Sequence, residues 1–439
     1  QRVWGVPLPI FINKKTKEPL RDKKVIERIA SIYEKQGSDC WFTDDPKVFL
    51  GEEHNPNEYE KLNDIVEVWF DSGSTHSFVL EKRKDLKWPA DMYLEGSDQH
   101  RGWFHSSLLE SCGTRGSAPF KSILSHGFVV DGKGMKMSKS MGNVISPEDI
   151  LKNYGADILR VWVASSDYAE DLRIDKSILI QHAESYRKIR NTFRFMLGNL
   201  KDKFEKQSFE KLDLKEFDEL EQYILHKIYS ISKSVDNNLK NYNFHKLYKE
   251  LLNFCTLDLS SFYFDIRKDV LYCDSLNSKK RKNCVVVLNI LLESLLKWFA
   301  PILVFTTDEI YNLINMGDKS IHEYSFVDVP QSWENKELNT KWDKLFEIKQ
   351  ESNVAIESKR SSKEIGSSLE ADVKLTVDKE RFKLLENLNL AEYLITSKAE
   401  KLLSKNNEFK IEVTKAKGNK CPRCWKIMEQ SCTRCSDLI

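Results

Sequence analysis

Four cysteines near the carboxyl end have the spacing of a metal site. Cys421 and Cys424 form one C-x-x-C pair, seven residues follow, and Cys432 and Cys435 form a second pair. Two such pairs can bring four thiolates to one tetrahedron, which is the coordination of structural zinc. A closed sulfur shell leaves no position for water, so we expect this zinc to hold the fold rather than to catalyse. Two redox disulfides are the alternative.

The residues around these cysteines are mostly basic. Between positions 410 and 439, seven Lys and Arg side chains outnumber three acidic ones, and Trp425 lies between the two cysteine pairs. Basic side chains bind phosphates and an exposed indole can stack on a base, so this tip is a candidate RNA contact. The alternative is a basic surface that only keeps the tip soluble.

A second candidate site is the segment DGKGMKMSKSMGN (131–143), which contains three lysines, three glycines and one acidic residue. Glycine lets a backbone approach an anion closely, and lysine brings a point charge to phosphate oxygens. Such a loop could neutralise the charge that develops on a pyrophosphate leaving group. The alternative is a solvated turn.

The elements that would position the lysine-rich segment belong to an α/β region. From residue 1 to about 165, short apolar runs alternate with Gly, Pro and polar turns. Shortly after the lysines, Ser146 and Pro147 predict the start of a helix, and Gly155 predicts its end. The segment is therefore expected to lead from a strand into a capped helix.

The cysteine cluster follows a helical region and a smaller mixed unit. Residues 174–314 show helical periodicity, which predicts a bundle of helices with Ile224, Ile228 and Leu251 among the buried positions. The basic run NSKKRKN (277–283) is expected to be a solvated loop between two helices. Residues 342–412 combine one helix with two alternating strands and predict a small α+β unit.

Composition excludes several classes of protein. The 439 residues are enough for several domains. With 68 Lys and Arg against 67 Asp and Glu, the formal net charge is +1, so any polyanion site must be local. The most apolar stretch, 285–305, contains polar residues and Pro301, so no membrane span is expected. Five of the nine cysteines are scattered, which favours a reducing cytoplasm.

Residues 136–140 read KMSKS, and several longer strings before and after them are equally distinctive. These strings are RVWGVPLPIF (2–11), VWFDSGST (68–75), YLEGSDQHRGWFHSSLL (93–109), SHGFVVDGKGMKMSKSMGNVISPEDILKNYGADILRVW (125–162) and LKWFAPILVFTTDEI (296–310). With them and the cysteine quartet, the sequence resembles the class I aminoacyl-tRNA synthetases, and within that class the bacterial isoleucyl enzymes. The resemblance covers nearly the whole chain.

The resemblance implies roles for three residues of the KMSKS segment. Lys136 and Lys139 would be catalytic, because they would contact the phosphates of ATP, and Ser138 would support the same phosphates. In that family the HIGH motif lies in the first half of the catalytic sheet, and an editing domain is inserted before the sheet resumes. The chain resembles the part after the editing domain, and we expect that it cannot activate an amino acid alone.

The resemblance also implies an adenylate site at the end of the YLEG strand. Glu95 would contact isoleucyl-adenylate, and Asp98 and Gln99 would bind ATP on its adenosine and ribose side. Helix capping is the alternative for Glu95 and Asp98. Trp69 and Trp103 are candidates for the wall of the isoleucyl pocket, with ordinary burial as the alternative.

The fold class implied is α/β, followed by an all-α bundle, a small α+β unit and a zinc knuckle. We expect the second half of a Rossmann-like parallel sheet in residues 1–165 and an anticodon-binding bundle in residues 166–340. A C-terminal junction unit would occupy residues 341–415, and a four-cysteine zinc finger residues 416–439.

The activity implied is that of an isoleucine–tRNA ligase. Such an enzyme activates isoleucine with ATP and Mg²⁺ to isoleucyl-AMP and transfers the isoleucyl group to tRNA(Ile). One structural Zn²⁺ per chain, a monomer and a cytoplasmic location are expected, with no membrane partner. The alternatives are a valyl- or leucyl-tRNA synthetase, or a zinc-dependent RNA-binding protein without catalysis.

Overall fold

The computed structural model describes residues 5–201, 204–314 and 317–435. The chain divides into two compact units, which are described separately. The first unit comprises Gln1–Val129 and Tyr168–Leu172, and the second comprises Val130–Asp167 and Arg173–Ile439. Over the described ranges, no helix combines the length and the apolar character that crossing a membrane requires.

The first unit has mixed α/β structure. An antiparallel pair of strands, β1 and β2, lies beside a small core formed by Phe11, Val25, Ile29, Trp41 and Phe49. The helices of this unit are α1 (Lys23–Gln36), α2 (Cys40–Thr43), α3 (Pro46–Leu50), α4 (Val68–Gly73) and α5 (Trp103–Arg115). Its strands are β1 (Phe11–Asn13), β2 (Tyr59–Lys61), β3 (Tyr93–Gly96) and β4 (Ile123–His126).

The β3–α5–β4 segment is a crossover between parallel strands. β3 and β4 pair in parallel, with Glu95 opposite Ser125, and α5 connects them. Parallel strands require such a connection because no tight turn can join them. The described part of the first unit thus contains mixed α/β structure with one parallel pair of strands, β3 and β4, where half of a Rossmann-like parallel sheet was expected.

The second unit begins with the lysine-rich loop and a capped helix. β5 (Val129–Asp131), at the boundary between the units, pairs with β6 (Leu172–Ile174). α6 (Pro147–Tyr154) starts where predicted: the Ser146 Oγ accepts a hydrogen bond from the Glu148 N–H at 3.2 Å. The helix ends at Gly155, whose φ of 84° is in the region that glycine tolerates best. The predicted helix boundaries are confirmed.

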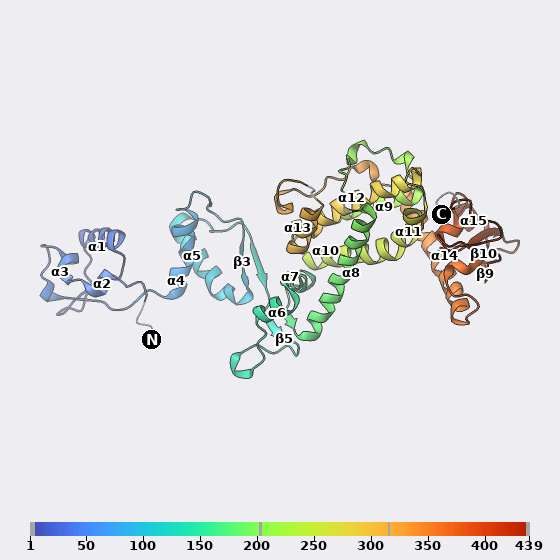
Figure 1. Cartoon of the computed structure of the whole chain (residues 1–439). Coiled ribbons are helices and arrows are strands. Elements are labelled where there is room, and N and C mark those ends of the chain that lie inside the picture. The colour runs from blue at the N-terminus through green and yellow to red at the C-terminus, as the bar shows by residue number, and fades with distance from the viewer. Residues whose placement is uncertain (1–4, 202–203, 315–316, 436–439) are drawn as a thin grey trace. The chain divides into compact units, whose positions relative to one another are not determined.

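A bundle of helices forms most of the second unit, and Figure 1 shows α9, α10 and α12 beside one another. Ile224, Ile228 and Leu251 are fully buried, as their spacing predicted. The helices that lead into the bundle or form it are α7 (Ala156–Ser165), α8 (Lys176–Leu200), α9 (Glu219–Lys240), α10 (Phe244–Asn253), α11 (Phe264–Cys273), α12 (Lys279–Phe299) and α13 (Val304–Leu313). A π-helix, Phe254–Tyr263, joins α10 to α11.

The prediction that residues 277–283 form a solvated loop is wrong. α12 begins at Lys279, and the Ser278 Oγ caps it by accepting from the Arg281 N–H at 3.4 Å. The side chain of Lys280 forms an ion pair with Glu392, and Arg281 donates to the Asp274 carbonyl at 2.7 Å. From sequence alone this basic run looks solvent-exposed, because Glu392, the acidic partner of Lys280, is distant along the chain.

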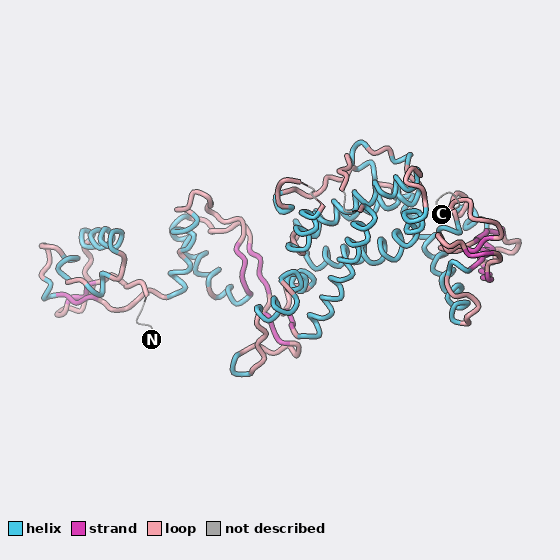
Figure 2. The backbone as a smooth tube through the Cα atoms, viewed as in Figure 1, coloured by secondary structure: helices cyan, strands magenta, loops and turns pink. Residues whose placement is uncertain are grey.

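A three-stranded sheet follows the bundle, and Figure 2 shows its strands gathered near the carboxyl end. The strand order is β8-β7-β9, with β7 (Ala371–Val377) parallel to β8 (Lys398–Leu403) and antiparallel to β9 (Lys410–Lys415). The remaining elements are α14 (Lys336–Ser361), α15 (Lys379–Leu384), α16 (Leu390–Tyr393), β10 (Asn419–Lys420) and β11 (Ile427–Met428). One continuous cluster of buried side chains runs from the bundle into this sheet.

Candidate active site and metal centre

The expected adenylate residues lie where β3 ends. Glu95 is the third residue of this strand, and Asp98 and Gln99 lie in the 3₁₀ turn that follows it. Ligands of open α/β sheets bind beyond the carboxyl ends of the strands, so the position suits a nucleotide. Glu95 and Asp98 are exposed, and Gln99 is half-buried.

Of these three residues, Gln99 binds a backbone N–H at the amino-terminal end of α5. Its Oε1 accepts a hydrogen bond from the Trp103 N–H at 3.0 Å, at the first residue of α5, and its Nε2 donates to Asp98 at 3.3 Å. Neither Glu95 nor Asp98 accepts a hydrogen bond from a backbone N–H of α5 in the described part of the chain. The capping role considered for the two acids is thus taken by Gln99.

The two tryptophans occupy different environments within the first unit. The Trp103 ring stacks on Tyr93 with centroids 4.1 Å apart, and its Nε1 donates to the Ser72 carbonyl at 2.9 Å. Trp69 is 40% exposed and lies against Gly102, where an added Cβ would be 3.0 Å from the indole. Trp103 therefore joins α5 to β3 and α4, while Trp69 keeps part of its ring accessible.

The lysine-rich loop is held by Asp131 and Asn143, two residues for which no role was predicted. The Asp131 Oδ1 accepts from the N–H groups of Lys133 and Met135 at 3.0 and 2.8 Å, and its Oδ2 accepts from the Asn143 Nδ2 at 2.9 Å. The hydrogen bond from Asn143, followed by that from Met135, lowers the pKa of Asp131. Asp131 therefore stays ionised and fixes the turn.

Asn143 connects this turn to the KMSKS residues. Its Oδ1 accepts from the Ser138 N–H at 2.9 Å, and its Nδ2 also donates to the Lys136 carbonyl at 3.2 Å. The side chains of Lys136 and Lys139 are exposed and have no acidic partner among the residues that the structure describes. The loop thus presents two cations on a fixed backbone, which is an arrangement that receives an anion.

The adenylate residues and the lysine loop belong to different units. Glu95, Asp98, Gln99, Trp69 and Trp103 lie in the first unit. Lys136, Ser138 and Lys139 lie in the second unit.

The four terminal cysteines come together as their spacing predicted. Their sulfur atoms all lie within 4.8 Å of one another, and the Sγ atoms of Cys424 and Cys432 are 3.8 Å apart. A zinc–sulfur bond of about 2.3 Å places tetrahedral sulfurs about 3.8 Å apart. All four are free thiols, so the donor set and its geometry fit a structural zinc ion.

The first cysteine pair is shaped by its own backbone. The Cys421 N–H donates to the Lys426 carbonyl at 2.9 Å, and the Trp425 N–H donates to the Cys421 carbonyl at 3.0 Å. Burial disfavours the Cys421 thiolate, yet the N–H groups of Cys424 and Arg423 lower the pKa of this thiol to about 7. Burial raises the pKa of Cys424 to about 11. A cation is needed to hold all four sulfurs as thiolates.

The surface of this knuckle carries an exposed aromatic residue. Trp425 is 59% exposed, adopts a positive φ of 64°, and has the Lys420 Nζ 5.8 Å from its ring centroid. Gly418 precedes the β10–β11 hairpin with a φ of 117°, and a Cβ there would lie 2.0 Å from the Met428 carbonyl oxygen. The hairpin therefore requires glycine at this position and presents Trp425 to solvent.

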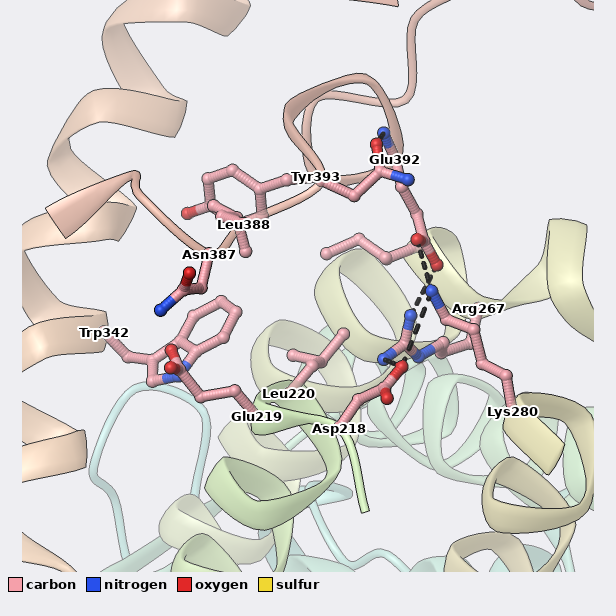
Figure 3. Close-up of a pocket in the computed structure, with 12 residues that line it drawn as sticks. Asp218, Glu219, Leu220, Arg267, Lys280, Trp342, Asn387, Leu388, Glu392 and Tyr393 are labelled. Carbon is pink, nitrogen blue, oxygen red and sulfur yellow. Dashed lines mark hydrogen bonds and ion pairs between the residues drawn. The ribbon is translucent and has the colours of Figure 1, made fainter. Parts of the chain in front are cut away.

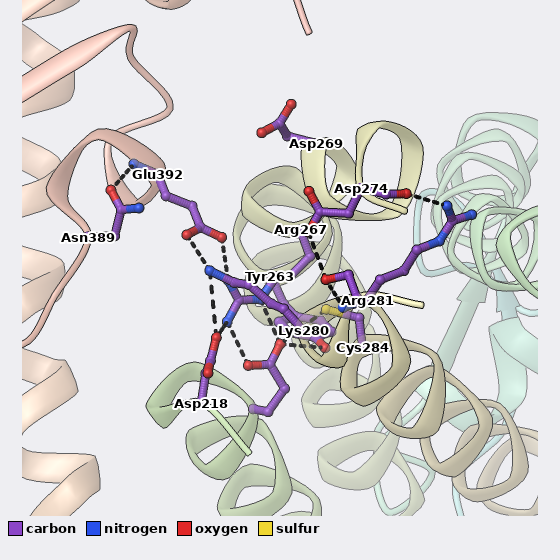
Figure 4. A network of polar contacts seen from close by, with 12 residues as sticks. Asp218, Tyr263, Arg267, Asp269, Asp274, Lys280, Arg281, Cys284, Asn389 and Glu392 are labelled. Carbon is purple, nitrogen blue, oxygen red and sulfur yellow. Dashed lines mark hydrogen bonds and ion pairs between the residues drawn. The ribbon is translucent and has the colours of Figure 1, made fainter. Parts of the chain in front are cut away.

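A network of charged side chains lies where the bundle meets the C-terminal sheet (Figure 4). Arg267 of α11 makes two hydrogen bonds to Glu221 of α9, both 2.6 Å long. Glu392 of α16 forms ion pairs with Arg267 and with Lys280 of α12. Burial alone would raise the pKa of Glu392, but the charges of Arg267 and Lys280 lower it.

A cavity of about 240 Å³ lies beside this network, and Figure 3 shows side chains that line it. Arg267 and Glu392 line one side, and Trp342 and Tyr393 line the other. Arg267 and Glu221 are almost fully buried, so their charges are available to one another and not to solvent. The network therefore joins elements of the bundle to the C-terminal segment.

Comparisons with known proteins agree with these features. Residues 1–175 match the model of class I tRNA synthetases for I, L, M and V, and residues 221–375 match the anticodon-binding domain of tRNA ligases. The isoleucine–tRNA ligase of Pelagibacter ubique is 65% identical over 100% of this chain and 48% of its own length. The chain is similar to class I aminoacyl-tRNA synthetases over most of its length.

Other relatives support the isoleucyl branch of these synthetases. The isoleucine–tRNA ligase of Gluconobacter oxydans is 44% identical over 100% of the chain and 46% of its own length. The resemblance to the bacterial isoleucyl enzymes is confirmed, and these relatives do not favour the valyl or leucyl alternative. The chain spans about half the length of the curated relatives it matches.

A solved structure supports the synthetase fold. The ternary complex of Agrobacterium radiobacter K84 LeuRS with tRNA and LeuAMS aligns with a TM-score of 0.57 over 93% of this chain and 50% of that one. The sequences are only 15% identical, so this similarity concerns the fold alone.

Proposed function

We propose that this synthetase chain is part of an isoleucine–tRNA ligase, which forms isoleucyl-AMP from isoleucine and ATP with Mg²⁺ and transfers the isoleucyl group to tRNA(Ile). The observation that carries the proposal is the lysine loop. Lys136 and Lys139 project from a backbone fixed by Asp131 and Asn143 and lack acidic partners in the described ranges. Preorganised cations of this kind stabilise charge that develops on phosphate oxygens.

The proposed chemistry depends on positioning and charge neutralisation. Lys139 contacts the phosphates of ATP as pyrophosphate leaves, and Lys136 and the Ser138 hydroxyl support the same phosphates. Glu95 contacts the isoleucyl-adenylate, and Asp98 and Gln99 bind its adenosine side. Trp69, with part of its ring accessible, is the stronger candidate for the isoleucyl pocket, because Trp103 is engaged with Tyr93 and Ser72.

The zinc site and the tRNA contacts complete the proposal. One Zn²⁺ bound by Cys421, Cys424, Cys432 and Cys435 stabilises the knuckle, which contacts RNA through Trp425. Residues 166–340 bind the anticodon side of tRNA(Ile), residues 1–165 form half of the catalytic sheet, and residues 341–415 join the bundle to the knuckle at 416–439. We propose a cytoplasmic monomer.

The test of the activity uses isoleucine-dependent pyrophosphate exchange. The protein assayed carries this chain together with the half of the relatives' length that the chain does not span. Exchange with isoleucine that exceeds exchange with valine and leucine is the expected result. Binding of tRNA without exchange by any of the three amino acids would instead favour an RNA-binding protein without catalysis.

The test of the metal site is elemental analysis of the 439-residue chain, purified without chelator. One zinc per chain is expected, and the double variant Cys421→Ser, Cys424→Ser should lose it. In the assay protein, the same double variant should impair aminoacylation more than adenylate formation, because the knuckle contacts RNA. An unchanged metal content in the double variant would refute the site.

A further inference from the structure

Both cysteine pairs of the knuckle have an arginine immediately before their second cysteine, and the two arginines reach the same helix end. Arg434, in Cys-Thr-Arg-Cys, forms ion pairs with Asp269 and Asp274 at the end of α11; its Nε lies 2.5 Å from Asp274. Arg423, in Cys-Pro-Arg-Cys, donates to the Tyr272 carbonyl at 3.1 Å. The repeated arginine therefore has a use that zinc coordination does not explain.

These contacts satisfy groups that a helix end leaves open. The last carbonyls of an α-helix have no partner inside the helix, and the helix dipole favours positive charge there. The Arg434 Nη2 donates to the Asp269 carbonyl at 3.3 Å in addition to the ion pairs of this side chain. The knuckle thus supplies two cations to the carboxyl end of α11.

Packing beside the arginines supports a fixed placement of the knuckle. Cys273, the last residue of α11, is 4% exposed and belongs to the same buried cluster as Cys421, Cys424 and Cys435. On another side, the Ile427 N–H donates to the Ser397 Oγ at 2.6 Å. The knuckle is held by the bundle and by the segment before β8.

We propose that Arg434 is a positioning residue that couples metal binding in the knuckle to docking of the knuckle on α11. The inference rests on the zinc site proposed above. Metal binding fixes the second cysteine pair and therefore the backbone from which Arg434 reaches Asp269 and Asp274. Linkage is reciprocal, so contacts that favour the metal-bound shape also retain the metal. Loss of a carboxylate on α11 should speed the release of zinc from cysteines on another element.

The experiment measures zinc release from the full 439-residue chain to a chromophoric chelator. We expect release to be about tenfold faster in Arg434→Ala and at least about threefold faster in Asp269→Asn, within the range of ordinary coupling energies. Because the two residues act through one contact, the double variant should release zinc less than about twofold faster than Arg434→Ala alone. Arg434→Lys, which keeps the charge, should lie between wild type and Arg434→Ala.

The control is Lys405→Ala, which removes an exposed cation from the loop between β8 and β9. Its release rate should stay within about twofold of wild type. Hydrogen exchange of residues 419–428 should increase in Asp269→Asn, whereas exchange in α9 and α12 should not change. This comparison separates loss of docking from general unfolding and remains informative if Arg434→Ala does not fold.

The outcomes separate this inference from the proposed metal site. Zinc absent from the wild-type chain would overturn both. Zinc present in the wild type, with release from Asp269→Asn and Arg434→Lys equal to wild type, would overturn the coupling alone. Additive effects of the two single variants would also overturn it, because independent residues do not share a contact.

Discussion

Lys139 is exposed on a loop whose backbone is fixed by other side chains, so its charge is free to act on a ligand. In the assay protein, which carries this chain together with the half of the relatives' length that it does not span, Lys139→Ala should slow isoleucyl-adenylate formation by at least about tenfold. This factor corresponds to roughly 1.4 kcal/mol. Isoleucine binding should change little. The matched control is Lys133→Ala, an exposed lysine of the same loop outside the KMSKS string. Equal rates for both variants would contradict the role of Lys139.

Asn143 holds the same loop through both ends of its amide, so a nearly isosteric change should loosen it. Asn143→Asp keeps an acceptor for the Ser138 N–H but loses the donor to Asp131 and places a second carboxylate beside it. We expect the loop to become less stable because a hydrogen bond is lost, which should be seen as faster hydrogen exchange over residues 133–143. Asn191→Asp, an exposed site on α8, is the control. Hydrogen exchange in Asn143→Asp equal to that of the wild type would show that the hydrogen bonds of Asn143 do not hold the loop.

The residues predicted from sequence were those that belong to short local patterns. Spacing alone identified the cysteine quartet, whereas the roles of Lys136 and Lys139 were implied by the family resemblance of the short string in which they lie. Asp131 and Asn143 lie in the same string, but their roles depend on the path of the turn. The pairing of Arg434 with Asp269 was not predictable, because nothing in either local sequence specifies a partner so distant along the chain.

At the scale of a helix, α9 contains a buried histidine whose environment disfavours charge. Burial, followed by the nearby Lys227, lowers the pKa of His226, and its Nδ1 accepts from the Asn335 N–H at 3.0 Å. The unfolded chain therefore binds the proton more tightly than the folded chain. The stabilisation is present above the unfolded pKa near 6.5 and is lost as the pH falls through that value toward the lower folded pKa.

His226→Gln should reduce this pH dependence, since glutamine offers an acceptor that does not titrate in this range. We expect a smaller loss of unfolding free energy between pH 7.5 and 5.5 than in the wild type, measured by urea denaturation. Asn237→Gln, at an exposed site of the same helix, exchanges one amide that does not titrate for another and should leave the slope unchanged. A slope in His226→Gln as steep as that of the wild type would contradict the assignment.

Helices with complete local signals could be predicted well, and α6 is the clearest case. Its cap, its first-turn proline and its terminal glycine are all adjacent to the helix, so sequence specified both ends. The start of α12 was missed, because a basic run does not show that Lys280 and Arg281 have partners on α16 and at the end of α11. Contacts with elements elsewhere in the fold therefore decide whether a basic residue is solvated, and the local sequence does not show these contacts.

For the second unit as a whole, the Arg267 network should be a main determinant of stability. Arg267→Met would leave the buried Glu221 without its charged partner, which typically costs about 3–5 kcal/mol. Urea unfolding of the 439-residue chain measures this loss. The control is Lys374→Ala, which breaks an exposed pair with Glu400 and should change the free energy of unfolding little. Similar losses in both variants would show that the buried network has no special weight.

The change from alternating to helical periodicity could be read from the sequence, but the hydrophobic core that the bundle shares with the C-terminal sheet could not. The alternating strands near residues 371–377 and 410–415 were expected, and β7 and β9 lie there. The shared core of bundle and sheet depends on side chains from elements far apart in sequence, such as Ile224 and Val373. Periodicity indicates which face of an element is apolar, but not which other element covers it.

The docking of the knuckle on α11 has a consequence for the order in which the chain is made. A ribosome releases the amino end first, and domains fold as they emerge. Asp269 leaves the ribosome 165 residues before Arg434. Until Arg434 has been made, the carboxyl end of α11 and the Cys273 side chain lack their contacts with the knuckle. A nascent chain halted before Arg434 would keep this helix end open. Docking of the knuckle on this helix end is therefore a late step in the folding of the second unit.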